Sequence, residues 1–289
     1  MSTAHEYMHV EDRMPDPVSY PPFRHDPRGN RLEWWTTTQT QSGHALWLRG
    51  PIEAVRQVQA VDPAYRDVRY VTDTSGWTHA LPSPEPTAKP AVRLLLDLLK
   101  EIIIVPSGAI DLVAALDWYK IPAEGVDSYQ WPNTETGELV SSGKYRYRQA
   151  PGPQAEAGRN LASRICNVID RHALLKDVSI VLNVPGHDSR LVSFGSRLAA
   201  TVARDRGLPM IKVHTSSLFR AAAKELERHK LAQMFDDEFS VPSEVRGCSV
   251  LIVDDVIRSG TSMAAVGKAA RASGAYRVFG IGAVRTMRR

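Results

Sequence analysis

The sequence predicts an α/β protein whose C-terminal half contains a mostly parallel, twisted sheet with helices on both faces. Short apolar runs alternate with segments of helical periodicity from Gln154 to the end of the chain. The apolar runs are nearly continuous in Val, Ile and Leu, as in strands that are covered on both sides. The helical segments end at Gly207 and Gly274, and glycine is a common stop signal. Alternation of this kind implies right-handed crossovers between parallel strands.

The sequence of residues 1–140 favours an α+β accessory or hood domain. Residues 1–30 are rich in Pro, His and Asp, so we expect an irregular arm there. The expected elements are strands at 45–48 and 68–71, a helix at 51–60, a proline-rich linker or long loop at 81–90, and an apolar helical region from 91 to about 119.

The second predicted domain covers residues 141–289 and carries the clearer alternation of elements. Its expected elements are helices at 155–172, 191–206 and 261–273, strands at 178–184, 210–213, 249–254 and 277–284, and a long polar stretch at 214–238.

Charge is distributed unevenly along the chain. The 289 residues carry a net charge of +4. Residues 1–150 contain 15 basic and 19 acidic residues, whereas residues 151–289 contain 21 basic and 13 acidic residues. A basic half is suited to a polyphosphate or to a nucleic acid, and charge alone does not separate these two partners.

Several protein classes are disfavoured by the sequence. The longest apolar stretch, residues 94–115, is interrupted by charged residues and by Pro106, so we expect no membrane span. The N-terminus lacks a basic segment followed by an apolar one, so we expect no secretory signal. Cys166 and Cys248 stand in dissimilar contexts without zinc-type spacing, which favours two reduced thiols. These features favour a cytoplasmic protein.

The run Val250–Ser262 carries the strongest chemical signal. Four apolar residues lead into Asp254 and Asp255, and the small run Ser259-Gly260-Thr261-Ser262 precedes a helix. Ligands of open α/β sheets bind beyond the carboxyl ends of the strands. Backbone N–H groups before a helix favour a phosphate, to which the hydroxyls can also donate. The carboxylates would repel that phosphate but suit the hydroxyls of an attached sugar. The alternative is an ordinary buried strand that ends in an acidic turn.

The same run resembles the phosphoribosyl-pyrophosphate-binding motif of type I phosphoribosyltransferases. The resemblance implies that Asp254 and Asp255 hold the ribose hydroxyls, and that the loop Ser259–Ser262 holds the 5-phosphate. Two positions depart from the family pattern, which commonly has Thr or Ser at Arg258 and Gly or Ala at Thr261. Arg258 can add a charge-assisted phosphate contact. The departures make substrate binding a firmer expectation than fast turnover.

A second segment resembles the pyrophosphate loop of the ComF-like branch of that family. Val184-Pro185-Gly186-His187-Asp188-Ser189-Arg190 follows the predicted strand at 178–184. A tight turn at Pro185 and Gly186 exposes N–H groups to pyrophosphate, and Arg190 adds charge. His187 is either a ligand contact or a loop residue in solvent. The polar stretch 216–238 occupies the place of the family's mobile loop, with Lys224, Arg228, His229 and Lys230 as candidate pyrophosphate contacts or as a solvated helix face.

The resemblance covers residues 140–289 and implies transfer of a phosphoribosyl group from phosphoribosyl pyrophosphate to a nitrogenous base or related acceptor. It implies Mg²⁺ bound mainly through the substrate, release of pyrophosphate, a place in nucleotide metabolism and a homodimer. The alternative is a non-catalytic or regulatory ComF-like protein that binds phosphoribosyl pyrophosphate, a nucleotide or DNA. Hydrolysis or phosphorolysis of a nucleotide is a third alternative. The sequence does not identify the acceptor.

Overall fold

The computed structural model describes residues 23–71, 76–146, 151–186, 192–215 and 238–287. The chain divides into two compact units. Unit 1 contains residues 1–104 together with Arg171–Ala173, and unit 2 contains residues 105–170 and 174–289. The predicted boundary between residues 140 and 141 therefore falls inside unit 2. The difference arises because residues 112–118 form a strand that pairs within the sheet of unit 2.

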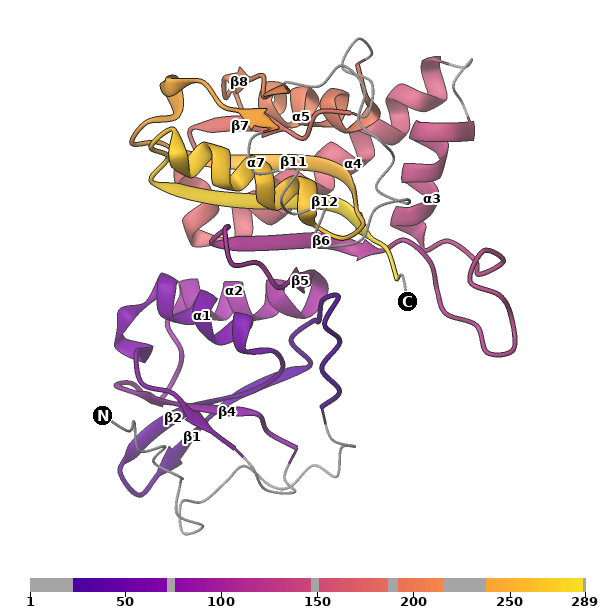
Figure 1. Cartoon of the computed structure of the whole chain (residues 1–289). Helices are drawn as coiled ribbons and strands as arrows, with labels where there is room; N and C mark the ends of the chain where they lie inside the picture. The colour runs from indigo at the N-terminus through magenta and orange to yellow at the C-terminus, as the bar shows by residue number, and fades with distance from the viewer. Residues whose placement is uncertain (1–22, 72–75, 147–150, 187–191, 216–237, 288–289) are drawn as a thin grey trace. The chain divides into compact units, whose positions relative to one another are not determined.

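Unit 1 is an α+β body with a four-stranded sheet in the order β1-β2-β4-β3, in which every neighbouring pair is antiparallel. Two helices, α1 and α2, lie side by side on one face of this sheet (Figure 1). Its elements are β1 (Trp34–Thr40), β2 (Gly43–Arg49), α1 (Ile52–Val61), η1 (Pro63–Tyr65), β3 (Arg69–Tyr70), β4 (His79–Ser83) and α2 (Pro90–Glu101).

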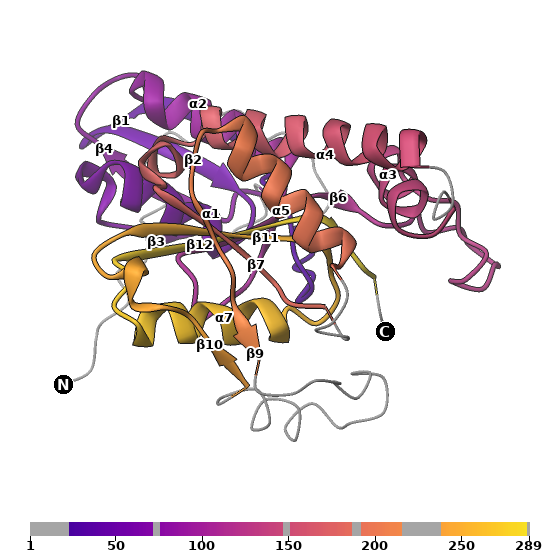
Figure 2. The same cartoon turned by 90° about the horizontal axis from the view of Figure 1, so that it is seen from above.

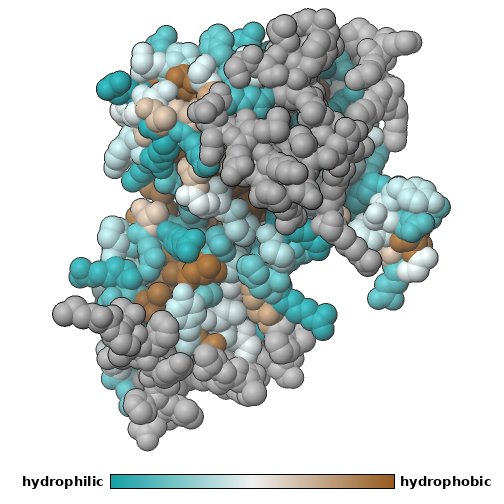
Figure 3. All heavy atoms as spheres, viewed as in Figure 1, coloured by the Kyte–Doolittle hydropathy of each residue, from teal (hydrophilic) through white to brown (hydrophobic). Residues whose placement is uncertain are grey.

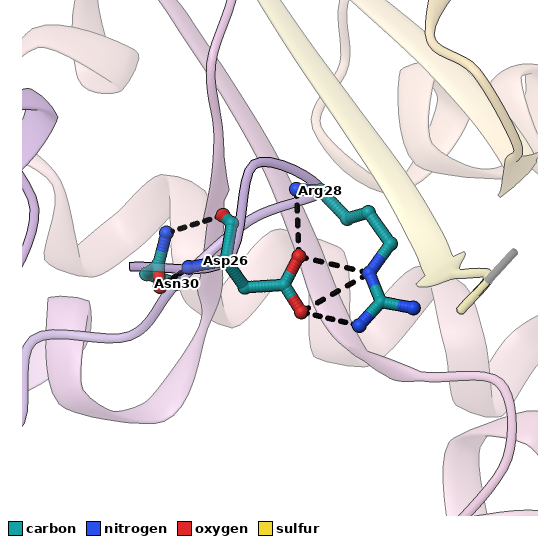
Figure 4. Close-up of polar contacts among 3 residues, drawn as sticks. All are labelled: Asp26, Arg28 and Asn30. Atoms are coloured by element: carbon teal, nitrogen blue, oxygen red, sulfur yellow. Dashed lines mark hydrogen bonds and ion pairs between the residues drawn. The ribbon is translucent and has the colours of Figure 1, made fainter. Parts of the chain in front are cut away.

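The first described residues of unit 1 form a polar turn. The carboxylate of Asp26 accepts from the backbone N–H of Arg28 at 2.8 Å and also binds the Arg28 guanidinium (Figure 4). Asn30 closes the turn, because its amide donates to the Asp26 carbonyl at 2.7 Å. The backbones of Asn30 and Ile104 then exchange hydrogen bonds of 3.0 and 2.8 Å. Side-chain bonding thus replaces regular structure at this end, as expected for a short Asx-type turn.

Unit 2 is built on a mostly parallel sheet, as the sequence predicts. The strand order is β5-β6-β12-β11-β7-β8, and the pairs from β6 to β8 are parallel. β5 (Ile103–Val105) is the segment where the chain passes from unit 1 into unit 2. The other strands of this sheet are β6 (Leu112–Trp118), β7 (Ile180–Asn183), β8 (Met210–Ile211), β11 (Ser249–Ile257) and β12 (Arg277–Arg285).

Helices cover both faces of this sheet. Figure 2 shows α7 (Thr261–Ala272) on one face, and α4 (Pro151–Arg171) and α5 (Phe194–Asp205) on the other. The remaining elements of unit 2 are α3 (Glu135–Ser141), η2 (Ser142–Arg146), η3 (Ala173–Asp177), β9 (His214–Thr215), β10 (Phe239–Ser240) and η4 (Ser243–Val245). Figure 3 shows hydrophilic residues over most of the described surface in that view, with apolar residues in separate small patches. No helix among the described residues is long and apolar enough to cross a membrane.

Two predicted segments differ from the structure. The expected helical region from 91 to about 119 is wrong beyond Glu101, because β5 and β6 follow α2. β6 is buried over its first four residues, and a strand buried on both faces has the continuous apolar sequence of a buried helix. The expected linker at 81–90 contains the last residues of β4, where Pro82 lies opposite Ala45 in the sheet.

Candidate functional site

The candidate site lies where the chain leaves two neighbouring strands in opposite directions. After β7 the chain enters α5 on one face of the sheet, and after β11 it enters α7 on the other face (Figure 2). Such a topological switch point, at the carboxyl ends of parallel strands, is where open α/β sheets bind ligands. A cavity of about 290 Å³ opens there. Its lining residues are Lys144, Val184, Pro185, Gly186, Ser193, Asp254, Asp255, Val256, Ile257, Arg258, Ser259, Gly260, Ser262 and Met263.

The acidic pair lies inside β11 and not in the turn after it. β11 continues to Ile257, and the Oδ1 atoms of Asp254 and Asp255 lie 2.8 and 3.6 Å from the place of a Cβ atom at Gly195, so both carboxyls are next to the first turn of α5. The backbone N–H of Asp255 donates to Oδ1 of Asp254 at 2.8 Å. Burial and the neighbouring Asp255 carboxylate raise the pKa of Asp254 well above its usual range. In this pair, therefore, Asp254 has a raised pKa, and Asp255 as a whole residue is only 5% exposed.

A lysine from a distant part of the chain meets this pair. Nζ of Lys144, in η2, lies 2.7 Å from Oδ2 of Asp255. Lys144 lies outside the motif Val250–Ser262 and is not among the predicted site residues. Its contact is with a carboxylate that is 7% exposed, which places the ammonium group at the inner wall of the cavity.

The first turn of α5 packs directly on the acidic pair. A Cβ atom at Gly195 would lie 2.8 Å from Oδ1 of Asp254 and 3.3 Å from the backbone nitrogen of Asp255. Both distances are shorter than ordinary van der Waals contact, so only glycine fits at this place. Gly195 is therefore a positioning residue for the carboxyl of Asp254.

The end of β7 is tied to the same helix. Asn183 is 3% exposed, and its amide donates to Oγ of Ser196 at 2.9 Å. Ser193 caps α5, because its hydroxyl accepts from the backbone N–H of Ser196 at 3.0 Å. These bonds fix the start of α5 at the carboxyl end of the sheet, next to Pro185 and Gly186 in the cavity wall.

The loop between β11 and α7 has the geometry of an anion cradle. Gly260 takes φ +83°, ψ −5°, a left-handed conformation that favours glycine. It precedes α7, and the backbone N–H of Thr261, the first residue of the helix, donates to Oγ of Ser259 at 3.3 Å. Oγ of Ser259 accepts from the hydroxyl of Thr261 at 2.9 Å. A helix start of this kind favours phosphate.

A buried arginine holds the beginning of the loop. Arg285 ends β12, is 6% exposed, and donates to the carbonyl of Ile257 at 3.3 Å. The backbone N–H of Thr286 donates to the same carbonyl at 3.0 Å. Gly282 lies under Ile257, because a Cβ there would approach the Ile257 side chain to 2.5 Å. The end of β12 thus contacts both the carbonyl and the side chain of Ile257, where the loop begins.

Most of the predicted site residues come together in the structure. The cavity includes both carboxylates, Arg258 and the small residues of the loop except Thr261, and it includes Pro185 and Gly186. Thr261 lines a second cavity of about 290 Å³ on the α7 side of the loop. His187, Arg190 and the candidates Lys224, Arg228, His229 and Lys230 lie outside the described residues. The roles of all these residues stay predictions.

Sequence reasoning missed Lys144, Gly195 and Arg285. Lys144 lies in a basic segment far from the motif in the sequence, and nothing in that segment indicates that its partner is Asp255. Gly195 lies in the first turn of a predicted helix, where glycine is less favourable than other residues. This unfavourable residue was the one sign in the sequence that the position has a special packing role. Arg285 stands at the end of an apolar strand, where a buried charge implies a partner.

Two carboxylates at the site could contribute to holding a magnesium ion. Among the described residues, no group of three or more His, Cys, Asp or Glu side chains gathers in a way that would hold a metal. The acidic pair alone offers two carboxylates, one of which is engaged by Lys144. Magnesium commonly binds one or two carboxylates together with substrate phosphates.

Two solved structures resemble part of the chain. An adenine phosphoribosyltransferase matches 48% of this chain and 72% of its own chain, at 16% identity and a TM-score of 0.33. The adenine phosphoribosyltransferase from Leishmania tarentolae matches 53% of this chain and 88% of its own chain, at 11% identity and a TM-score of 0.35. No family model and no curated protein sequence matches the chain. Function therefore rests on the site itself.

Proposed function

We propose that unit 2 binds a phosphorylated ribose at the switch point, and that the protein is a phosphoribosyltransferase of the type I fold. One observation carries this proposal: a single cavity joins the acidic pair Asp254–Asp255 to the loop Ser259–Ser262 at the start of a helix. Carboxylates accept hydrogen bonds from sugar hydroxyls, and a helix start binds phosphate. A ribose 5-phosphate needs both in one place.

The proposed reaction transfers the ribosyl group from phosphoribosyl pyrophosphate to a nitrogen nucleophile. The bond between C1 and the pyrophosphate oxygen breaks, pyrophosphate leaves with the electron pair, and the nitrogen lone pair forms the new bond to C1. Asp254 and Asp255 orient the ribose, and the residues of the loop hold the 5-phosphate. Positioning and stabilisation of the leaving group supply the rate acceleration. The role of unit 1 in selecting the acceptor is part of this proposal.

Magnesium is expected to enter with the substrate. Its charge would neutralise the pyrophosphate group and ease departure of that group. The chain's own part is to orient the ribose through the acidic pair and to keep Arg258 at the cavity wall, where its guanidinium can meet a phosphate.

A thermal-shift screen with phosphoribosyl pyrophosphate, ribose 5-phosphate, nucleotides and free bases, in the presence of magnesium, tests the proposal. A ligand at a hundred times its dissociation constant stabilises the folded protein by about 2.7 kcal/mol. We expect such stabilisation by phosphoribosyl pyrophosphate, and release of pyrophosphate when an acceptor base is added.

The matched variants are Asp254→Asn combined with Asp255→Asn, and Asp177→Asn as a control at an exposed position before β7. The double variant should lose both ligand stabilisation and pyrophosphate release while it keeps a cooperative unfolding transition. The Asp177 variant should keep both. Unchanged pyrophosphate release in the double variant would exclude the proposed site.

Binding without transfer is the second candidate function. It is favoured by the net positive charge of residues 151–289 and by the departures at Arg258 and Thr261. Ligand stabilisation without pyrophosphate release for any base would support a regulatory binding protein. Nucleic-acid binding whose affinity falls steeply with salt would support a DNA partner, and hydrolysis of a nucleotide would support the third alternative.

A further inference from the structure

Lys144 forms an ion pair with one residue of the acidic pair. Its Nζ lies 2.7 Å from Oδ2 of Asp255, and the lysine side chain keeps 29% of its surface exposed. The partner carboxylate is buried inside β11, whereas the lysine opens into the cavity. The ammonium group is thus positioned between the acidic pair and the space that a ligand would fill.

The fold holds Lys144 at this place through a chain of close contacts. Thr134 caps α3 by accepting from the backbone N–H of Gly137 at 2.9 Å, and Gly137 packs on the carbonyl of Tyr119, where a Cβ would approach to 2.1 Å. η2 continues from α3, and Gly143 packs on the Phe194 ring, where a Cβ would approach to 2.2 Å. Lys144 follows Gly143 directly, so the packing of Gly143 on Phe194 holds its backbone close to the start of α5.

The charges in the cavity explain why a fixed cation is useful there. The Asp255 carboxylate and the phosphate of a ligand repel each other. In many sites a divalent cation offsets such repulsion. A lysine ammonium in contact with one carboxylate can therefore offset a large part of the repulsion without a metal.

We propose that Lys144 is the resident counter-ion of the Asp254–Asp255 pair, so that ribose 5-phosphate binds to this protein without a divalent cation. The inference rests on the proposed function, because it takes the cavity to be a ribose-phosphate site. Lys144 acts here as a positioning and specificity-determining residue. A pyrophosphate group would still bring its own magnesium, whereas the ribose 5-phosphate part of the ligand would not need one.

Calorimetric titration with ribose 5-phosphate tests the inference on the full chain, once with a chelator and once with magnesium. For the unaltered protein we expect dissociation constants that agree within about twofold under the two conditions. For Lys144→Met we expect metal-free binding to weaken by about tenfold or more, which corresponds to about 1.4 kcal/mol. Magnesium should restore part of that loss, and Lys144→Arg should keep metal-free binding because it keeps the charge.

Lys176→Met is the matched control, because Lys176 is exposed in η3, before the first residue of β7 and away from the cavity lining. It removes the same charge and should leave both dissociation constants unchanged. Unfolding curves of each variant show whether the fold is kept. If Lys144 instead blocked the site as a latch, Lys144→Met would bind ribose 5-phosphate more tightly, and that result overturns the inference.

Two further outcomes separate the inference from the proposed function. Binding by the unaltered protein that requires magnesium overturns the counter-ion role of Lys144 and leaves the ribose-phosphate site in place. No binding of ribose 5-phosphate under either condition overturns both. Metal-free binding that is equally tight in the unaltered protein and in Lys144→Met shows that the ion pair is structural, and it also overturns the inference.

Discussion

At Asp254, stability and the proposed binding of a ribose phosphate oppose each other. Its carboxyl is held by the backbone N–H of Asp255 and by the close approach of Gly195, beside a second carboxylate. Burial and Asp255 raise its pKa, so the ionised form that would accept bonds from a sugar is unfavourable in the folded protein. Function-related strain of this kind commonly lowers stability.

We expect Asp254→Asn to stabilise the protein at neutral pH. A raised pKa in the folded state means that folding favours the protonated carboxyl. Its stabilising contribution is fully present below the unfolded-state pKa, about 3.9, and is lost as the pH rises through the raised folded-state pKa. Asn has no charge to lose, so the variant should gain roughly 1 kcal/mol at pH 7, in the range of single-substitution effects.

Urea unfolding at pH 7 and at an acidic pH near the ordinary Asp value measures this difference. The gain of Asp254→Asn should shrink as the pH falls, because the wild-type carboxyl becomes protonated. A variant that is destabilised equally at both pH values would show that the carboxylate makes a favourable contribution to the fold.

Gly195→Ala tests the close contact between α5 and the acidic pair. The added Cβ would lie 2.8 Å from Oδ1 of Asp254, so either the carboxyl or the helix must shift. We expect at least about a tenfold loss of ribose 5-phosphate affinity, or about 1.4 kcal/mol, measured by calorimetric titration. Gly152→Ala is the control, since a Cβ there meets nothing within 4 Å. Equal affinities in the two variants would contradict the positioning role of Gly195.

At the scale of elements, the site is built mainly from one continuous segment, which consists of β11, the loop after it and α7. β11 brings the carboxylates to the cavity, Gly260 turns the chain, and α7 begins directly behind the turn. Two neighbouring elements contact this segment. α5 packs on the acidic pair, and the end of β12 contacts Ile257. The geometry of the loop therefore depends on backbone conformation more than on any one side chain.

Gly260→Ala should reduce both stability and ligand affinity. An alanine at φ +83° is strained by about 1–2 kcal/mol, although a Cβ would meet only Ile257 at 3.9 Å. Gly247→Ala is the matched control, because Gly247 has φ +73° and nothing within 4 Å, and it precedes β11. Urea unfolding should show similar destabilisation of the two variants, and titration with ribose 5-phosphate should show weakened binding only for Gly260→Ala. Equal affinities would mean that the loop does not hold the phosphate.

At the scale of the whole molecule, two units with separate cores share one chain. All residues that line the candidate cavity belong to unit 2. The core of unit 1 includes Leu46 in β2, and the core of unit 2 includes Leu182 in β7, and both side chains are fully buried. Loss of packing in one unit can therefore be compared with loss in the other.

Leu46→Ala and Leu182→Ala should separate stability from ligand binding. Each substitution removes a fully buried side chain and should cost about 2–5 kcal/mol of unfolding free energy. We expect Leu46→Ala to keep ribose 5-phosphate affinity within about twofold, whereas Leu182→Ala should weaken it, because β7 leads directly into the cavity wall. Thermal unfolding and titration measure both quantities. A parallel loss of affinity in Leu46→Ala would show that the site depends on unit 1.

Local patterns in the sequence were sufficient for the α/β alternation of unit 2 and for the residues of its central motif. β7, β11, α7 and β12 lie within a few residues of their predicted bounds. The same reasoning failed between Ile102 and Trp118, where buried strands have the composition of a buried helix. Whether that motif binds a ribose phosphate stays a prediction.

The sequence by itself determined which residues form the strand, the acidic pair and the glycine turn, because these features are continuous in the chain and depend on local backbone preferences. Only the tertiary structure decided what meets them. Lys144 reaches Asp255, Gly195 approaches Asp254, and Arg285 holds Ile257. The pairing of β11 with β7 and β12 brings these segments together, and pairing between distant strands depends on packing of the whole sheet, which no short stretch of sequence specifies.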